Sequence, residues 1–426
     1  MKKHNQTNLF KANSLAQIYE KEMTPYWAYD LNVIKSQIEK LKAFDVIRYA
    51  QKTNSNIHVL KLMKQNGVFV DAVSEGELFR ALKAGFDNKK NPNEIVFTAD
   101  VINQQTLNLV VENKIPVNAG SIDMLEQVGK VAAKHPVWIR INPGFGHGHS
   151  QKTNTGGENS KHGIWHTQLE QALNVIKKYD LTLVGIHMHI GSGVDYGHLE
   201  QVCDAMVLQV EEIVKLGFDL EAISAGGGLS IPYHIDGAEI DTEHYFKLWN
   251  NARIRIENLL KHSVSLEIEP GRFLVAQSGI LVSKVHAVKL MGQNKFVLVD
   301  AGFNDLMRPS MYGSYHAISV IKNKPDGKLE WACTEGNVED VVVAGPLCES
   351  GDVFTQHEGG VVDKRTLPII AVNDLLVFHD AGAYGASMSS NYNSRPLIAE
   401  YAFDNDNITC IRRKQSIDSL IALEDI

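Results

Sequence analysis

Short apolar runs rich in β-branched residues alternate with longer amphipathic segments between about residues 46 and 271. In the longer segments apolar residues recur at three- and four-residue spacing, which predicts helices, whereas the short runs predict buried strands. The clearest helical segments cover residues 75–84, 121–133, 167–178, 199–216 and 244–261. The predicted strands number eight and cover residues 46–50, 68–73, 95–98, 115–118, 137–141, 183–189, 223–225 and 264–268.

Eight strand–helix units predict a closed (β/α)8 barrel, which typically takes about 250 residues. The alternative is an open, doubly wound parallel sheet. That alternative is weaker, because eight strands close a barrel and no G-x-G-x-x-G fingerprint follows the first strand. We therefore expect an α/β fold with a TIM-like barrel as its larger part.

The pattern changes after about residue 273, where short apolar runs follow one another without helices between them. Turn residues separate these runs, which is typical of an antiparallel β domain. We expect residues 34–273 to form the barrel domain and residues 274–426 to form a mostly antiparallel β-sandwich or β-barrel domain, with residues 1–33 packing on it. Residues 143–160 are rich in Gly, His, Asn and Ser, and they predict a mobile loop over the barrel mouth.

Composition narrows the class of protein. The 426-residue chain has a net charge of -8 without a basic stripe, so nucleic acid is not an expected partner. No run of about 18 apolar residues predicts a membrane span, and the polar N-terminus does not resemble a signal peptide. The four cysteines show no CxxC pairing, which favours a reducing, cytoplasmic location.

Candidate chemistry lies at the carboxyl ends of the predicted strands, where (β/α)8 barrels carry their active sites. A lysine in a partly desolvated site loses its proton readily and can form a Schiff base. A glycine run after the seventh strand lets bare backbone approach a phosphate. The residues at these positions are Lys52, His189, Ser192, Gly226, Gly227, Gly228, Glu269 and Arg272.

Glu269 is a candidate for a carboxylate that faces a pyridine nitrogen and keeps that nitrogen protonated. Glu267 has the same side parity and should lie deeper, with a partner such as Arg140. His187 and His189 also share a side, and an H-x-H pair on a barrel strand is one signature of a metal site. Because further ligands at the other strand ends are not evident, we expect no metal and interpret His189 as a ring that stacks on a flat cofactor.

Seven motifs in order carry a resemblance that runs from about residue 25 to residue 415. They lie at residues 49–52 (YAQK), 189–192 (HIGS), 226–228 (GGG), 269–272 (EPGR), 300–309 with Tyr312, 348–352 (CESGD) and 382–385 (GAYG). This set resembles the diaminopimelate decarboxylases, which are pyridoxal phosphate (PLP) enzymes of fold type III with an alanine racemase-like barrel. The resemblance implies decarboxylation of meso-2,6-diaminopimelate to L-lysine, the last step of lysine biosynthesis.

The resemblance also implies roles for individual residues. Lys52 would bind the PLP aldehyde, His189 would stack on the ring, and Glu269 would bond the pyridine nitrogen. The phosphate would be held by Ser192, the glycines 226–228 and Tyr384. A homodimer with shared sites is implied, in which Cys348 and Glu349 enter the neighbour's site and Cys348 protonates the carbon that loses CO2. The expected substrate contacts are Arg272, Arg308, Tyr312, Glu349 and Tyr384.

Several rival functions share parts of this pattern. A decarboxylase of ornithine, arginine or carboxynorspermidine would use the same cofactor, but Arg308 near Tyr312 suits a carboxylate at the far end of the substrate. An amino-acid racemase would place an arginine at the pyridine nitrogen, so Glu269 argues against it. A catalytically inactive regulator is disfavoured by the intact Lys52, Glu269 and Cys348, and a metal hydrolase is the remaining alternative.

Overall fold

The computed structural model describes residues 9–89, 92–146, 154–191, 193, 195–234, 236–333 and 336–424. The chain divides into two compact units. One consists of Gln37–Ser230 and Ile240–Phe273, and the other of Met1–Ser36, Ile231–Glu239 and Leu274–Ile426.

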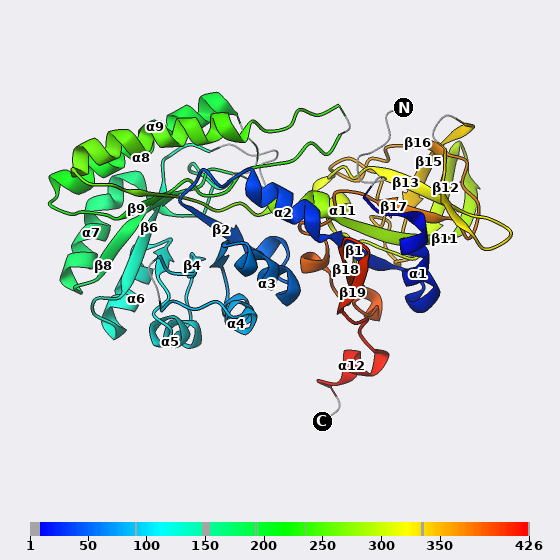
Figure 1. Ribbon diagram of the computed structural model, residues 1–426, viewed down its shortest axis with the longest axis horizontal. Coiled ribbons are helices and arrows are strands. Elements are labelled where there is room, and N and C mark those ends of the chain that lie inside the picture. Colours follow the sequence, from blue (N-terminus) through cyan, green and yellow to red (C-terminus); the bar gives the residue numbers. More distant parts are fainter. Residues whose placement is uncertain are drawn as a thin grey trace. The chain divides into compact units, whose positions relative to one another are not determined.

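The first unit is a closed parallel barrel, which confirms the predicted fold class (Figure 1). The strands follow the order β5-β4-β3-β2-β10-β9-β8-β6, and the β5–β6 pairing closes the circle, while β7 (Ile164–Trp165) adds to β6. Every predicted strand run is present. The barrel strands are β2 (Val46–Ala50), β3 (Phe69–Ala72), β4 (Ile95–Ala99), β5 (Val117–Ala119), β6 (Pro136–Asn142), β8 (Thr182–Met188), β9 (Ala222–Ser224) and β10 (Ser265–Ile268).

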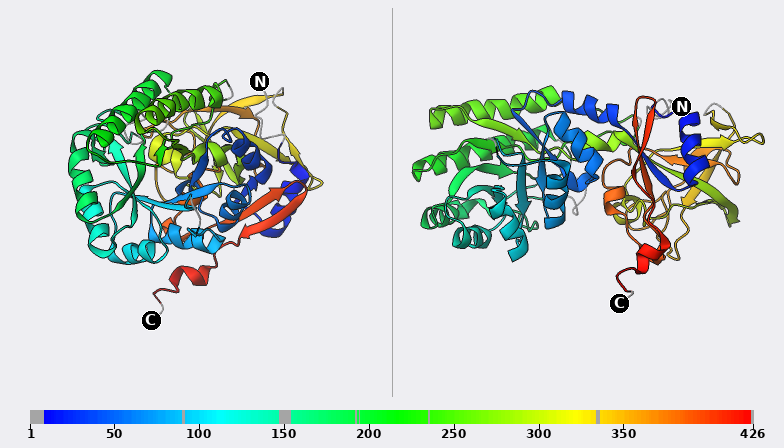
Figure 2. Two further views of the ribbon diagram at one scale, coloured as in Figure 1. Left: turned by 60° about the vertical axis from the view of Figure 1, so that its left-hand side comes forward. Right: turned by 60° about the horizontal axis from the view of Figure 1, so that its bottom comes forward.

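Helices surround the barrel strands, as the left view of Figure 2 shows. Each helix buries an apolar stripe and exposes a polar face, as the amphipathic spacing in the sequence predicts. In α4, for example, the Ser74 side chain caps the first turn by accepting from Glu77 N–H, and Gly85 ends the helix in the left-handed conformation. The helices of this layer are α3 (Ile57–Gln65), α4 (Glu75–Ala84), α5 (Gln104–Glu112), α6 (Ile122–Val131), α7 (Leu169–Lys178), α8 (Tyr196–Lys215) and α9 (Thr242–Leu260).

The middle of the barrel interior is polar, although such interiors are usually filled by branched apolar side chains. Strand register places Asn118 opposite Thr98, Arg140 opposite His187, and His187 opposite Ser224. All of these side chains are buried, as is Asp71 on β3. We call this set the polar layer; its members are Asp71, Thr98, Asn118, Arg140, His187 and Ser224.

The second unit is built on a mostly antiparallel sheet in the order β14-β13-β17-β11-β1-β18-β19, with β12, β15 and β16 attached through β11. Two pairings are parallel, β1–β18 and β12–β15. The strands are β1 (Tyr26–Asp30), β11 (Gly279–Met291), β12 (Asn294–Val299), β13 (Ile318–Asn323), β14 (Leu329–Trp331), β15 (Val338–Ala344), β16 (Arg365–Pro368), β17 (Leu375–Phe378), β18 (Ala399–Asp404) and β19 (Asn407–Arg412).

The side chains of β1 point alternately into two apolar clusters of this unit. Trp27 and Tyr29 pack into one cluster, and Tyr26 packs into the other on the opposite face. The second cluster is covered by α1 (Ala12–Glu22), where the Tyr26 hydroxyl donates to the Leu15 carbonyl at 3.0 Å. The N-terminal segment is thereby fixed to strands from the C-terminal part of the chain.

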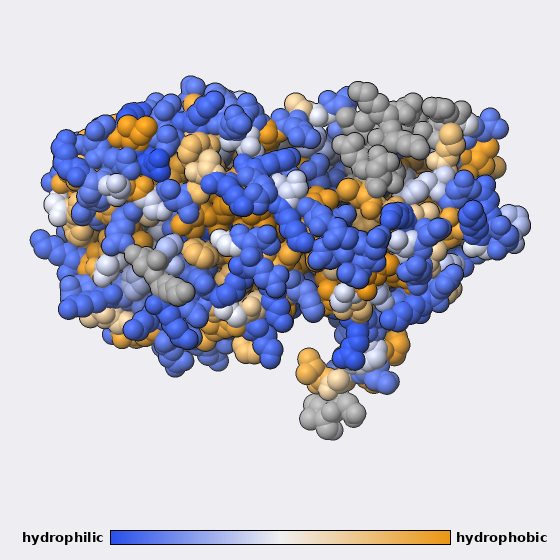
Figure 3. All heavy atoms as spheres, viewed as in Figure 1, coloured by the Kyte–Doolittle hydropathy of each residue, from blue (hydrophilic) through white to orange (hydrophobic). Residues whose placement is uncertain are grey.

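Hydrophilic side chains cover much of the face seen in Figure 3, with apolar atoms scattered among them. Across the described residues, no helix combines the length and the apolar character needed to cross a membrane.

Candidate active site

Lys52 lies on a single 3-10 turn, Gln51–Thr53, that directly follows β2 at the barrel mouth. The turn is fixed by Thr53, whose hydroxyl contacts the Ala50 carbonyl and the Tyr49 hydroxyl, both at 2.9 Å. Gln51 and Thr53 are buried, whereas Lys52 is exposed. Its ammonium group contributes to the pKa values of Asp71, Glu77 and His189, so these side chains share one electrostatic environment.

Glu269 follows β10 and is buried at the same mouth. One carboxylate oxygen accepts from Ser224 Oγ at 2.8 Å, and the other lies 2.9 Å from His187 Nε2. Burial alone would raise the pKa of Glu269, but the interactions with His187, Ser224 and Arg48 outweigh it and hold the pKa at about 2. Glu269 is therefore a carboxylate at neutral pH.

His189 follows β8, two residues beyond His187. Its pKa lies well below the usual value, because burial disfavours the cation and the charges of Arg140 and Lys52 oppose it. The imidazole is therefore neutral near pH 7. A neutral flat ring at this place suits stacking against a planar ligand rather than ion pairing.

The glycine run packs directly against the ends of β8 and β10. A Cβ atom on Gly227 would lie 2.7 Å from the Glu269 carbonyl oxygen, and one on Gly228 would lie 2.8 Å from the Gly191 carbonyl oxygen. Gly226 and Gly228 also have positive φ angles of +61° and +112°. Glycine is thus required both by space and by backbone conformation, and the lining here is bare backbone.

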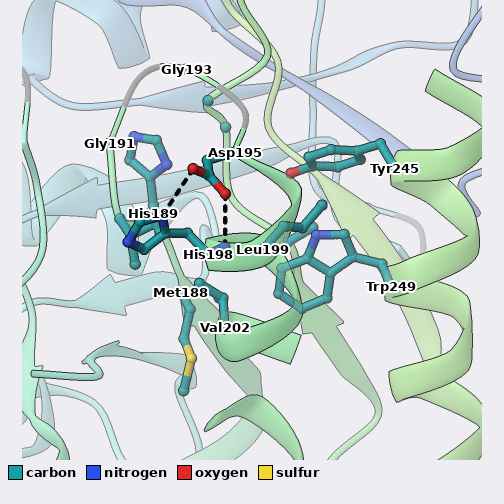
Figure 4. Close-up of a pocket in the computed structure, with 14 residues that line it drawn as sticks. Met188, His189, Gly191, Gly193, Asp195, His198, Leu199, Val202, Tyr245 and Trp249 are labelled. Atoms are coloured by element: carbon teal, nitrogen blue, oxygen red, sulfur yellow. Dashed lines mark hydrogen bonds and ion pairs between the residues drawn. The ribbon is translucent and has the colours of Figure 1, made fainter. Parts of the chain in front are cut away.

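A small pocket lies beside this run, between the end of β8 and helices α8 and α9 (Figure 4). His189, Gly227 and Gly228 line it, and Tyr245 and Trp249 project into it from α9. In the first turn of α8, the Asp195 side chain accepts from Gly197 N–H and His198 N–H, so these two amides are already paired. The glycine run offers an anion bare backbone at this rim.

The polar layer was not recognised from the sequence. Burial and the nearby Glu269 raise the pKa of Asp71 to about 8, so this carboxyl is largely protonated at pH 7. Arg140 is 8% exposed, and its Nη2 atom has no hydrogen-bond partner among the described residues. The available signal was the alternation of polar residues at inward positions of several barrel strands.

One predicted pair is wrong. Glu267 binds Arg48 rather than Arg140, with Arg48 Nη2 2.8 Å from Glu267 Oε2 and both side chains buried. The reason is topological, because β10 pairs with β2, which carries Arg48. Arg140 stands on β6 among Asp100, Glu269 and Asp71, the charges that act on its own pKa.

The predicted Ser192 lies outside the described residues, as do residues 147–153 of the 143–160 loop. The following part of that loop contacts the end of β8, where Thr155 N–H donates to the Ile190 carbonyl at 3.3 Å and its hydroxyl donates to the His189 carbonyl at 3.0 Å. Mobility of the loop stays a prediction. Arg272 begins α10 (Arg272–Val275) and is half-buried.

The other predicted residues belong to the second unit. Arg308 begins α11 (Arg308–Tyr312), is buried, and has its Nη1 atom 2.9 Å from His316 Nε2, with its guanidinium over the Tyr233 ring. Tyr384 has a positive φ of 56°. Cys348 is a free, exposed cysteine, and Glu349 is exposed beside it.

The residues of the barrel mouth fit pyridoxal phosphate. Lys52 offers an amine for its aldehyde, Glu269 a carboxylate for its ring nitrogen, His189 a flat neutral ring, and the glycines bare backbone for its phosphate. Arg140 Nη2 and Asp71 Oδ1, which have no hydrogen-bond partner within the described part of the chain, provide further buried polar groups next to the mouth.

Comparison with known proteins agrees with this fit. Residues 31–276 match the family model described as the pyridoxal binding domain of pyridoxal-dependent decarboxylases. The chain is 64% identical over 401 residues to the diaminopimelate decarboxylase of Escherichia coli strain K12, covering 94% of this chain and 93% of that protein. A crystal structure of a diaminopimelate decarboxylase superposes with a TM-score of 0.93 at 61% identity, covering 97% and 96% of the two chains.

The Helicobacter pylori diaminopimelate decarboxylase complexed with L-lysine is also similar, with a TM-score of 0.85 at 31% identity and coverage of 96% and 99%. The barrel and its mouth thus define a pyridoxal-dependent decarboxylase. Within that class, the chain belongs to the diaminopimelate decarboxylase family.

Proposed function

We propose that this chain decarboxylates meso-2,6-diaminopimelate to L-lysine and CO2 with pyridoxal phosphate as cofactor, as the last step of lysine biosynthesis. The observation that carries the proposal is the ionised Glu269, held by Ser224 and His187 in the barrel mouth that also carries Lys52. When bound, the cofactor supplies an electron sink for the pair left behind by CO2. Glu269 would support this role by keeping the ring nitrogen protonated.

Lys52 would hold the cofactor through its aldehyde and release it to the substrate amine. The neutral His189 would support one face of the ring, and residues 226–228, with Ser192 and Tyr384, would bind the phosphate. In this proposal residues 34–273 form the cofactor-binding domain, and residues 274–426, with 1–33, supply Arg308, Tyr312, Cys348, Glu349 and Tyr384 to the substrate side.

Arg308 is the proposed ligand of the substrate's distal carboxylate, with Arg272 and Tyr312 as further contacts. His316 Nδ1 lies 2.8 Å from the His379 carbonyl oxygen, which fits a protonated Nδ1 and leaves Nε2 to accept from Arg308. This contact orients the guanidinium. An arginine fork of this kind recognises a carboxylate bidentately and gains nothing from the ammonium group at the end of ornithine.

Cys348 is proposed to act across a homodimer interface, where its thiol would protonate the carbon that has lost CO2. Its segment is held in place, because Cys348 N–H donates to Asn393 at 2.9 Å and Asp352 accepts from Leu347 N–H at 2.8 Å. The exposed thiol and the neighbouring Glu349 can thus be offered to a second subunit. The four cysteines are free, which supports action in the reducing cytoplasm.

A substrate panel tests the proposal. The purified chain, reconstituted with pyridoxal phosphate, should release CO2 from meso-diaminopimelate and far more slowly from ornithine, arginine and carboxynorspermidine. Faster release from one of the latter three would replace the proposed substrate. No release from any of them, with the cofactor bound, would contradict the decarboxylase function itself.

A further inference from the structure

The H-x-H motif at the end of β8 contains one histidine that the proposed function leaves without a role. His189 faces the cofactor position, but His187 lies one layer deeper and is 2% exposed. Its Nε2 atom is 2.9 Å from a Glu269 carboxylate oxygen, an interaction that is also the largest attractive contribution to the low pKa of that carboxyl. Neither ring nitrogen of His187 has a hydrogen-bond partner of good geometry among the described residues, so its contact with Glu269 is a close electrostatic one.

Ser224 holds the other oxygen of the same carboxylate. Its hydroxyl donates to Glu269 at 2.8 Å and accepts from Gly226 N–H at 3.1 Å. Because the hydroxyl hydrogen is committed to Glu269 and a lone pair to Gly226, the serine has one orientation. Glu269 N–H in turn donates to the Gly226 carbonyl at 2.8 Å. The carboxylate and the first residue of the glycine run are therefore fixed to one another.

We propose that His187 and Ser224 are positioning residues that hold Glu269 as an oriented carboxylate facing the pyridine nitrogen, and that they thereby control the protonation of the cofactor ring. This inference rests on the proposed function. It gives His187 a role in keeping the cofactor ring protonated. His187 is then no longer a candidate metal ligand.

The surroundings of Glu269 explain why such support is needed. Burial disfavours its charge, and Asp71 and Glu267 lie in the same barrel interior. Neighbouring carboxylates would oppose the charge of Glu269, but Glu267 is paired with Arg48 and Asp71 is largely protonated at neutral pH. Without the Ser224 hydrogen bond and the close His187 imidazole, a buried Glu269 would take up a proton and could no longer attract one to the ring nitrogen.

Two substitutions of His187 separate loss of the ring nitrogens from loss of volume. His187→Phe removes the ring nitrogens and keeps a flat ring, whereas His187→Gln keeps an N–H near the position of Nε2. We expect His187→Phe to lower kcat about 10- to 100-fold with KM for diaminopimelate nearly unchanged, because the lost interaction acts on the transition state. His187→Gln should recover most of the loss, and Ser224→Ala should resemble His187→Phe.

Spectroscopy provides a readout independent of turnover. In His187→Phe and Ser224→Ala, the visible absorption of the bound cofactor should change with pH in a range where that of the wild type is constant, because the ring nitrogen is no longer held protonated. A pH-independent spectrum identical to that of the wild type would overturn the proposal. Far-ultraviolet circular dichroism and the melting temperature of each apoprotein show that the variants are folded.

A double-mutant cycle decides whether the histidine acts through Glu269. In a Glu269→Gln background, His187→Phe should cause no further loss of kcat, since the carboxylate it serves is gone. An equal loss in both backgrounds would show that His187 acts elsewhere and would overturn the inference. The wild type, assayed in parallel, separates failure of this inference from failure of the proposed function. If the wild type decarboxylates diaminopimelate and His187→Phe has the same kcat, only the positioning role of His187 is wrong.

Discussion

Arg48 and Glu267 form a buried ion pair one layer below the proposed cofactor position, with Arg48 Nη2 2.8 Å and Nε 2.9 Å from the same Glu267 oxygen. Arg48 also donates from Nη1 to the Asn93 carbonyl at 2.8 Å, and its guanidinium lies over the Phe69 ring. The pair joins β2 to β10, the first and last strands of the closed barrel. The ion pair therefore stabilises the contact between these two strands.

Breaking this pair should destabilise the barrel. Arg48→Met leaves Glu267 buried and unpaired, and the free energy of unfolding should fall by about 3–5 kcal/mol. The double variant Arg48→Met/Glu267→Leu removes both charges and should recover much of the loss. Urea unfolding followed by circular dichroism measures both values; equal stability of Arg48→Met and wild type would contradict the role of the pair.

This pair also shows how far the sequence could predict the structure. Periodicity located all eight barrel strands, and side parity placed Glu267 on the same face as Glu269 but deeper. Parity does not say which strand lies next to β10, because that depends on closure of the whole barrel. The partner of Glu267 was therefore assigned to the wrong arginine, and the contact of His187 with Glu269 was not foreseen.

Residues 231–239 illustrate a second limit. They interrupt the barrel sequence after β9 and belong to the other compact unit. Tyr233 lies under Arg308 there, and the His234 ring stacks on Tyr315 at 4.0 Å between centroids. No apolar periodicity in the sequence predicts that these residues leave the barrel unit, since their contacts are aromatic and lie about 80 residues away in the chain.

Lys52→Ala should abolish the visible absorption of bound pyridoxal phosphate and lower kcat by at least about 10³-fold, because the amine that binds the aldehyde is lost. Lys61→Ala is a matched control, since Lys61 is an exposed lysine on α3. Spectra and CO2 release are recorded for both variants. If Lys52→Ala kept the visible band, Lys52 would not be the cofactor lysine.

Asp71 should make the apoprotein less stable as the pH rises. Its folded pKa of about 8 lies above the ordinary value of 3.8, so its contribution is fully present below about pH 4 and is lost up to about pH 8. The expected slope for this one group is at most about 1.4 kcal/mol per pH unit. Asp71→Asn keeps the shape and cannot ionise, so its stability relative to wild type should grow from pH 5 to pH 8. Urea unfolding at each pH tests this, and a constant difference would refute it.

Arg308→Met should raise KM for diaminopimelate roughly 10- to 100-fold, because a hydrogen-bonded charge pair with the distal carboxylate is lost. Arg413→Met, at an exposed position near the C-terminus, serves as the control and should leave KM unchanged. Steady-state kinetics with purified, cofactor-saturated variants give the comparison. A KM for Arg308→Met within twofold of wild type would assign the distal carboxylate to another residue.

Mixing two inactive variants tests whether a site is shared between subunits. In a homodimer where Cys348 enters the neighbour's barrel, a Lys52→Ala subunit can still supply Cys348 to the Lys52 of a Cys348→Ala subunit. Half of the dimers in an equimolar mixture are then mixed, and one site in each is complete, so about a quarter of the wild-type activity should return. Activity is measured after dissociation and reassociation of the mixture, with each variant alone as control. Mixing that restores nothing, although mixed dimers are shown by differential tags, would place Cys348 and Lys52 of the same chain in one site.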